Sequence, residues 1–342
     1  MTDGAITVFA PGRVNLIGDH TDYAGGLSLP CAIDLGVTIT GHAANGHIEL
    51  QSGTLDGTVA FDTASPPTMP SIDPPWGRHV AAVLAQPGIV GGFVGHISST
   101  LPVGAGLSSS AALDVALALA LGHDGPRMDL ARLAQRAETA AVGVPCGLLD
   151  QLSVVFGRAD HVMMIDFGDD SIDQVRFPDD LDIWIVHSGQ ERVLESSAYA
   201  ERRAACELAA SRIGPLPVAT AAAIDSLDGS LRRRARHVAT ECARVRDAVV
   251  ALRHGDPVRL GRLMTESHAS LREDFEVSTP TLDRVVALML ETPGVHGARL
   301  TGAGFGGCAV AVCAHGAVTD PTALTGRGWL VRPAEGARRI DG

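Results

Sequence analysis

A loop rich in glycine and serine has the residue types that most directly suggest chemistry. It runs from Leu101 to Ala112, and Gly104 and Gly106 allow a tight turn that leaves backbone N–H groups exposed. The serines at 108–110 add hydroxyl groups and a helix cap, and an apolar helix is predicted directly after them. The N-terminus of a helix favours an anion with many oxygens. The loop therefore predicts a triphosphate cradle, and the alternative is an ordinary strand-to-helix turn.

A second group of chemically active side chains lies near the N-terminus. Arg13, Asp19, His20 and Asp22 fall within ten residues, after a short apolar strand predicted over residues 6–10. Such a segment is often a solvated loop. Apolar residues among the charged ones favour a site instead, because they anchor the loop in the core and fix the directions of its polar groups.

A single aspartate, Asp150, lies among apolar residues between Val144 and a helical turn predicted to begin near Gln151. An unpaired charge in such surroundings is costly, so Asp150 needs a partner. Two interpretations stay open on the pattern alone: Asp150 caps the helix, or it takes part in catalysis.

A second glycine-rich run, Leu300–Cys308, formally satisfies the Gly-x-Gly-x-x-Gly pattern of dinucleotide-binding proteins. That interpretation requires a helix directly after the glycines. An apolar strand is predicted over residues 309–312 instead, so we set dinucleotide binding aside.

The composition restricts how phosphate could be bound. The chain has 342 residues, a formal net charge of −12 and 27 basic residues, and every basic residue is arginine. A Walker-type loop needs its lysine, so backbone amides, hydroxyl groups, a metal ion and arginine must bind any phosphate. The acidic balance argues against a nucleic-acid partner.

No leader sequence or membrane-spanning segment is recognised, so we expect a cytoplasmic protein without a membrane partner. The six cysteines show no metal-binding spacing and are expected to be free thiols. The sequence is compatible with a monomer.

The elements needed to position these residues are mixed helices and strands. Strands are predicted over 31–43, 93–97, 161–166 and 182–187, and helices over 129–142, 231–254, 256–271 and 279–291. We place a domain junction in the acidic link at 169–180. The expected domains are residues 1–175, with the charged segment, the phosphate loop and Asp150, and residues 176–342, with the second glycine run.

Several of these segments resemble the galactokinases. Residues 12–23, Gly-Arg-Val-Asn-Leu-Ile-Gly-Asp-His-Thr-Asp-Tyr, are similar to the galactokinase signature, which usually has Glu where this chain has Asp19. The loop at 102–111 resembles the second motif of the GHMP small-molecule kinase superfamily, which includes galactokinase, homoserine kinase and mevalonate kinase. Residues 146–151, the segment around Tyr199 and the run at 300–308 resemble further galactokinase segments.

The resemblance implies a two-domain α+β fold with the active site in the cleft between the domains. It implies transfer of the γ-phosphoryl group of ATP to the anomeric hydroxyl of a sugar, with Asp150 as the catalytic carboxylate and Arg13 as its charge partner. Ser110 and Glu138 would hold Mg²⁺, and Trp76 would stack on the adenine. The residues implied to contact the sugar are Asp19, His20, Asp22, Gly147 and Tyr199. Those implied to contact the nucleotide are Trp76, Pro102, Gly104, Ala105, Gly106, Leu107, Ser108, Ser109, Ser110 and Ala111.

Two departures from the family pattern concern the substrate. Asp19 is one methylene shorter than the usual Glu, and Ala24 stands where the family commonly has Asn. A related sugar is therefore an alternative acceptor to galactose. Two further interpretations stay open: a superfamily kinase that acts on a non-sugar alcohol, and a galactokinase-like sensor that binds sugar and nucleotide without transferring a phosphoryl group.

Overall fold

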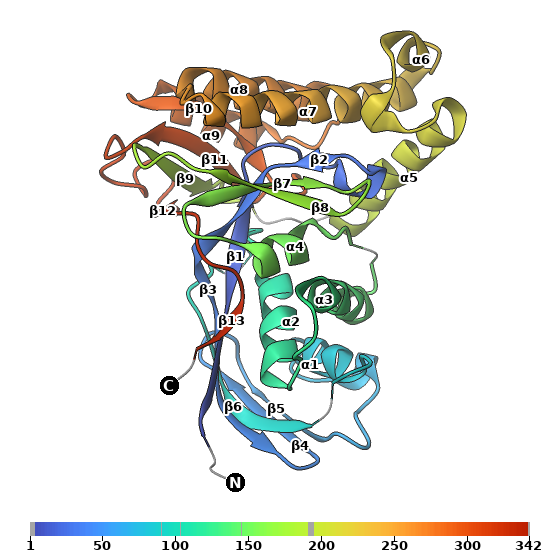
Figure 1. Ribbon diagram of the computed structural model, residues 1–342, viewed down its shortest axis with the longest axis vertical. Coiled ribbons are helices and arrows are strands. Elements are labelled where there is room, and N and C mark those ends of the chain that lie inside the picture. The colour runs from blue at the N-terminus through green and yellow to red at the C-terminus, as the bar shows by residue number, and fades with distance from the viewer. Residues whose placement is uncertain (1–3, 90, 103, 145, 191–194, 341–342) are drawn as a thin grey trace.

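The computed structural model describes residues 4–340 apart from residues 90, 103, 145 and 191–194. The N-terminal half is built on a six-stranded sheet in the order β13-β1-β3-β6-β4-β5 (Figure 1). Its strands are β1 (Ile6–Asn15), β3 (Pro30–Ala44), β4 (His47–Ser52), β5 (Thr58–Asp62), β6 (Gly92–Ser99) and β13 (Arg338–Ile340).

Helices cover one face of this sheet and bury its apolar side chains. They are α1 (Gly77–Leu84), α2 (Ser109–Ala120), α3 (Arg127–Val142) and α4 (Leu149–Phe156). Helix α2 is buried along nearly its whole length and packs against β1 and β3, as its run of Ala, Leu and Val requires. The phosphate loop, which precedes α2, is thereby fixed beside the sheet.

The C-terminal half contains a four-stranded sheet in the order β10-β11-β9-β12. Its strands are β9 (Leu181–His187), β10 (Val295–Thr301), β11 (Cys308–Ala314) and β12 (Gly328–Val331). Helices α8 (Pro257–Glu273) and α9 (Pro280–Glu291) pack against β10 and β11, α7 (Gly229–Arg253) packs on α8, and α5 (Glu195–Ile213) packs on α7. The short helix α6 (Ala221–Asp225) contacts α7.

The helices predicted over 256–271 and 279–291 are confirmed, and each begins one residue later than predicted, at Pro257 and Pro280. Asp256 and Thr279 occupy the N-cap positions, and their side chains accept hydrogen bonds from backbone N–H groups of the first turn. Proline fits the next position because its missing N–H has no intrahelical partner there.

Two short strands, β8 (Ser171–Arg176) and β13, were not predicted from the sequence. The acidic link at 169–180 contains β8, which pairs with β7 (His161–Asp166) in a three-stranded sheet with β2 (Leu27–Ser28). Strand β13, near the end of the sequence, pairs with β1 in the sheet of the N-terminal half. The proposed division into residues 1–175 and 176–342 stays a prediction.

Among the described residues, which include all six cysteines, the cysteines form no disulfide bond, and all except Cys146 are buried. Within the described residues, no helix is both long enough and apolar enough to cross a bilayer.

Candidate active site

A cavity of about 660 Å³ brings together the sequence segments singled out for their chemistry. Its walls come from the N-terminal charged segment, the phosphate loop, the segment around Asp150 and the second glycine run, which contributes Gly302 and Ala303. The predicted site residues that line it are Arg13, Asp19, His20, Asp22, Gly104, Gly106, Ser108, Ser109, Ser110, Glu138, Gly147, Asp150 and Tyr199.

Five of the predicted residues are not among the cavity-lining residues that the structure describes: Trp76, Pro102, Ala105, Leu107 and Ala111. Trp76 is buried, and its indole N–H donates to the carbonyl of Asp56 at 3.1 Å. Ala105, Leu107 and Ala111 are buried in the core. The nucleotide contacts of all five residues stay predictions.

Arg13 joins three segments of the site. Its Nε and Nη2 lie 2.8 and 2.6 Å from Oδ1 of Asp150, and its Nη1 donates to the carbonyl of Gly106 at 2.8 Å. A β-bulge between Pro11 and Arg13 interrupts the pairing of β1 with β3. The residue between them must be glycine, because a Cβ atom on Gly12 would lie 2.7 Å from the carbonyl oxygen of Leu107. The sequence Gly12-Arg13 thus lets β1 approach the phosphate loop closely enough for these contacts.

Ser108 has a different role from the one its position suggests. It occupies the N-cap position of α2 with a φ of +61°, and its side chain makes no capping hydrogen bond. Its hydroxyl instead donates to Oδ2 of Asp150 at 2.5 Å. The N–H groups of the first turn of α2, which have no intrahelical partner, are therefore left without a serine cap and can bind an anion.

Asp150 lies in the first turn of α4, so it does not cap that helix. Arg13 and Ser108 supply the partners that a carboxylate in apolar surroundings requires. Of the two interpretations left open by the sequence, the structure excludes the helix cap and places the carboxylate in the cavity wall.

Glu138 and Ser110 lie in the same cavity wall and supply hard oxygen atoms. Burial raises the pKa of Glu138 to about 8, and the negative charges of Asp114 and Asp150 act in the same direction. The amide of Gln151 donates to Glu138 Oε2 at 2.5 Å. A divalent cation would relieve this concentration of negative charge, and oxygen donors are the ligands Mg²⁺ prefers. The residues present therefore fit a magnesium site completed by phosphate oxygens and water.

His20 is held by protein groups at both ring nitrogens. Its Nε2 lies 3.1 Å from the carbonyl oxygen of Ala303, and its Nδ1 lies 3.0 Å from the hydroxyl of Tyr23. Burial lowers the pKa of His20 to about 4, so the ring is neutral near pH 7. Since a carbonyl only accepts, the proton is on Nε2, and Nδ1 accepts from Tyr23. His20 thus connects the N-terminal segment to the second glycine run.

Asp22 and Gly147 form the wall beside Tyr199. A Cβ atom on Gly147 would lie 1.5 Å from Oδ2 of Asp22, so a side chain at this position would force that carboxylate to move. Burial raises the pKa of Asp22 to about 6, and the charges of Asp150 and Asp19 act in the same direction. The Tyr199 ring packs against His20 and Tyr23, with centroid distances of 5.8 and 5.6 Å.

Sequence reasoning missed two residues that contact this site. Gln151, expected only as the start of a helix, contacts Glu138. Arg299, fully buried in β10, contacts Asp19 across the two halves of the chain. The sequence signal that could have found Arg299 is a single arginine within a strand of mostly apolar and small residues.

The fold and the site together define a class of protein. The family model described as "GHMP kinases N terminal domain" matches residues 78–158, and the model described as "GHMP kinases C terminal" matches residues 248–320. A crystal structure of the mevalonate kinase of Methanococcus jannaschii superposes with a TM-score of 0.72 at 20% identity, covering 98% of this chain and 99% of that one. The fold is that of the GHMP kinases.

More specific matches identify the branch. The "Galactokinase galactose-binding signature" matches residues 2–42. Galactokinase of Actinobacillus succinogenes is 39% identical over 89% of this chain and 84% of its own length, and that of Thermococcus kodakarensis is 38% identical over 96% and 98%. The crystal structure of Lactococcus lactis galactokinase complexed with galactose has a TM-score of 0.87 and 30% identity, covering 98% of this chain and 95% of that one. The chain belongs to the galactokinase family.

Proposed function

We propose that this protein transfers the γ-phosphoryl group of ATP to the anomeric hydroxyl of galactose, with Asp150 as the general base. The observation that carries the proposal is the position of the Asp150 carboxylate. It is held by Arg13 and Ser108 at the wall of one cavity that the galactose-binding signature and the phosphate loop share.

The transfer runs through positioning and charge neutralisation. Asp150 accepts the proton of the anomeric hydroxyl, whose oxygen forms a bond to the γ-phosphorus. The bond from that phosphorus to the β–γ bridging oxygen breaks, and ADP leaves with the electron pair. Arg13 lies against both the carboxylate and the phosphate loop, where its charge stabilises the negative charge that develops on the transferred group.

Nucleotide binding is assigned to the turn at Gly104 and Gly106 and to the N-terminus of α2. This assignment is supported by the absence of a serine cap on α2 and by the position of the loop in the cavity wall. Ser110 and Glu138 would hold Mg²⁺, which when bound neutralises phosphate charge. Stacking of the adenine on Trp76 is part of the proposal on resemblance alone.

The sugar is assigned to the wall formed by Asp19, His20, Asp22, Gly147 and Tyr199. Carboxylates there can accept hydrogen bonds from several hydroxyls, so a sugar that lacks one of them leaves a buried acceptor unpaired. This chemistry favours galactose over analogues that lack one of the contacted hydroxyls.

A screen of ADP release over hexoses, pentoses, amino sugars, mevalonate and homoserine tests the proposal. The expected result is selective turnover of galactose, with nuclear magnetic resonance showing the phosphate on the anomeric oxygen. Turnover of a different sugar or of a non-sugar alcohol would assign a different acceptor. Binding of galactose and ATP without ADP release would identify a sensor instead.

A further inference from the structure

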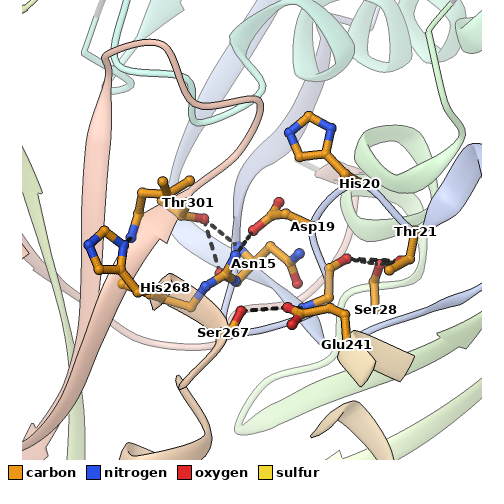
Figure 2. A network of polar contacts seen from close by, with 12 residues as sticks. Asn15, Asp19, His20, Thr21, Ser28, Glu241, Ser267, His268 and Thr301 are labelled. Atoms are coloured by element: carbon orange, nitrogen blue, oxygen red, sulfur yellow. Dashed lines mark hydrogen bonds and ion pairs between the residues drawn. The ribbon is translucent and has the colours of Figure 1, made fainter. Parts of the chain in front are cut away.

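The loop that carries the galactose-binding residues is attached to the C-terminal half of the chain (Figure 2). The N–H of Gly18 donates to Oε1 of Glu241 at 2.9 Å, and Nε2 of His237 donates to the carbonyl of Asp19 at 3.1 Å. Glu241 and His237 both lie on α7 and are buried. The phosphate loop and Asp150, by contrast, are held by elements of the N-terminal half.

The side chain of Asp19 is held by the same half. Nη2 of Arg299, on β10, lies 2.5 Å from Oδ2 of Asp19, and the two side chains are 0% and 3% exposed. Asp19 also lines the cavity. Arg299 therefore fixes Oδ2, and Oδ1 can accept a hydrogen bond from a ligand.

Stability alone does not explain this arginine. Nε and Nη1 of Arg299 have no partner within the described part of the chain, and neither does the side-chain amide of buried Asn15. Asn15 is a neighbour, because its backbone bonds to Thr301, two residues after Arg299 on β10. An apolar side chain of similar volume often stabilises a core as well as a buried ion pair does. A guanidinium offers something different, a directed N–H group in a rigid plane, which here bonds to Oδ2 of Asp19.

We propose that Arg299 is a positioning residue for the acceptor sugar, because it orients the Asp19 carboxylate with one oxygen presented to the cavity. The inference rests on the proposed function, in which Asp19 contacts the sugar. Arg299 itself is fully buried and acts through Asp19. Strand β10 leads directly into Gly302 and Ala303 of the cavity wall. One strand from the C-terminal half therefore contacts Asp19 of the sugar loop through Arg299 and also continues into the second glycine run.

The test measures kcat and KM separately for galactose and ATP in Arg299→Met, Arg299→Lys, Asp19→Asn and the double variant Asp19→Asn/Arg299→Met. Arg299→Met should raise the galactose KM about tenfold, leave the ATP KM within about twofold and change kcat less than the galactose KM. Lysine keeps the charge without the planar guanidinium, so Arg299→Lys should recover part of the loss. The galactose KM of the double variant should be no higher than that of the poorer single variant, since each substitution removes the same contact between Arg299 and Asp19.

Arg253→Met is the matched control, because it removes an exposed pair with Asp173 outside the cavity. It should leave both KM values unchanged. The positioning role would be overturned if folded Arg299→Met raised the KM for galactose and the KM for ATP equally. It would also be overturned if the galactose KM of the double variant rose by the product of the two single effects. If Arg299→Met does not fold, Arg299→Lys decides: a selective rise in galactose KM supports the role, and an unchanged value contradicts it. Absence of galactose turnover in the unsubstituted protein would instead contradict the proposed function.

Discussion

The hydroxyl of Ser108 lies 2.5 Å from Oδ2 of Asp150 and donates a hydrogen bond to it, although Ser108 stands where a helix cap is expected. Arg13 engages the other oxygen of the same carboxylate. These contacts fix the phosphate loop and the candidate base to each other. A carboxylate oxygen can accept more than one hydrogen bond, so a sugar hydroxyl can donate to Asp150 beside Ser108.

Ser108→Ala tests whether this contact orients the base. Loss of one hydrogen bond to a charged partner should lower kcat by roughly 10- to 100-fold, while the fold is kept. Ser211→Ala is a suitable control, because that exposed hydroxyl bonds to the carbonyl of Leu208 away from the cavity. An unchanged kcat in Ser108→Ala would show that Arg13 alone suffices to position Asp150.

Arg13→Ala separates transition-state from ground-state contacts. Because Arg13 touches both Asp150 and the carbonyl of Gly106, we expect kcat to fall about 10²- to 10³-fold and the ATP KM to rise far less. Steady-state kinetics at saturating galactose measure both values. Equal losses in kcat and in ATP affinity would mean that Arg13 acts mainly in ground-state binding.

Glu138→Gln tests the magnesium assignment. The amide is nearly isosteric but carries no charge, so the Mg²⁺ concentration needed for half-maximal turnover should rise about tenfold or more. The control is Glu266→Gln on α8, whose carboxylate is exposed and paired with Arg262. A Mg²⁺ dependence identical to that of the unsubstituted protein would remove Glu138 from the metal site.

Asp22→Asn links function to stability. Burial raises the pKa of Asp22 to about 6 in the folded protein, above the ordinary value of a carboxyl, so the folded state binds this proton more tightly. The resulting stability is present below about pH 4 and is lost as the pH rises through about 6. Asparagine cannot ionise, so the variant should gain about 1–2 kcal/mol of unfolding free energy at pH 8 and less at pH 5.

Urea denaturation at the two pH values measures this difference. The same variant should have a higher galactose KM at pH 8, because asparagine replaces a charged acceptor. A stability change that is equal at both pH values would show that Asp22 does not carry the raised pKa.

The parts of the fold that the sequence predicted are those governed by local pattern. A run of apolar residues predicted β7 over residues 161–166, and the helix predicted over 279–291 matches α9 to within one residue at its start. Strand β8 was missed because its six residues include several polar ones and lie in an acidic segment. Strand β13 was missed because its three residues are exposed and its partner, β1, lies at the other end of the sequence.

The candidate site shows the same division. The motifs predicted the segments around Arg13, Ser108 and Asp150, which the structure brings into one cavity. They did not predict which partner Ser108 binds. A serine at the start of a helix can either cap the helix or donate to a carboxylate, and the sequence looks the same in both cases. The pair of Asp19 with Arg299 joins residues 280 positions apart, and no local pattern specifies such a contact.

The most direct test of the whole account is phosphorylation of galactose by Asp150→Asn, compared with the unsubstituted protein at matched ATP occupancy. The substitution keeps the shape of the side chain but removes the base, so galactose 1-phosphate formation should fall by about 10³-fold or more while ATP binding is nearly unchanged. Formation of galactose 1-phosphate at close to the unsubstituted rate would contradict the assignment of Asp150 as the base.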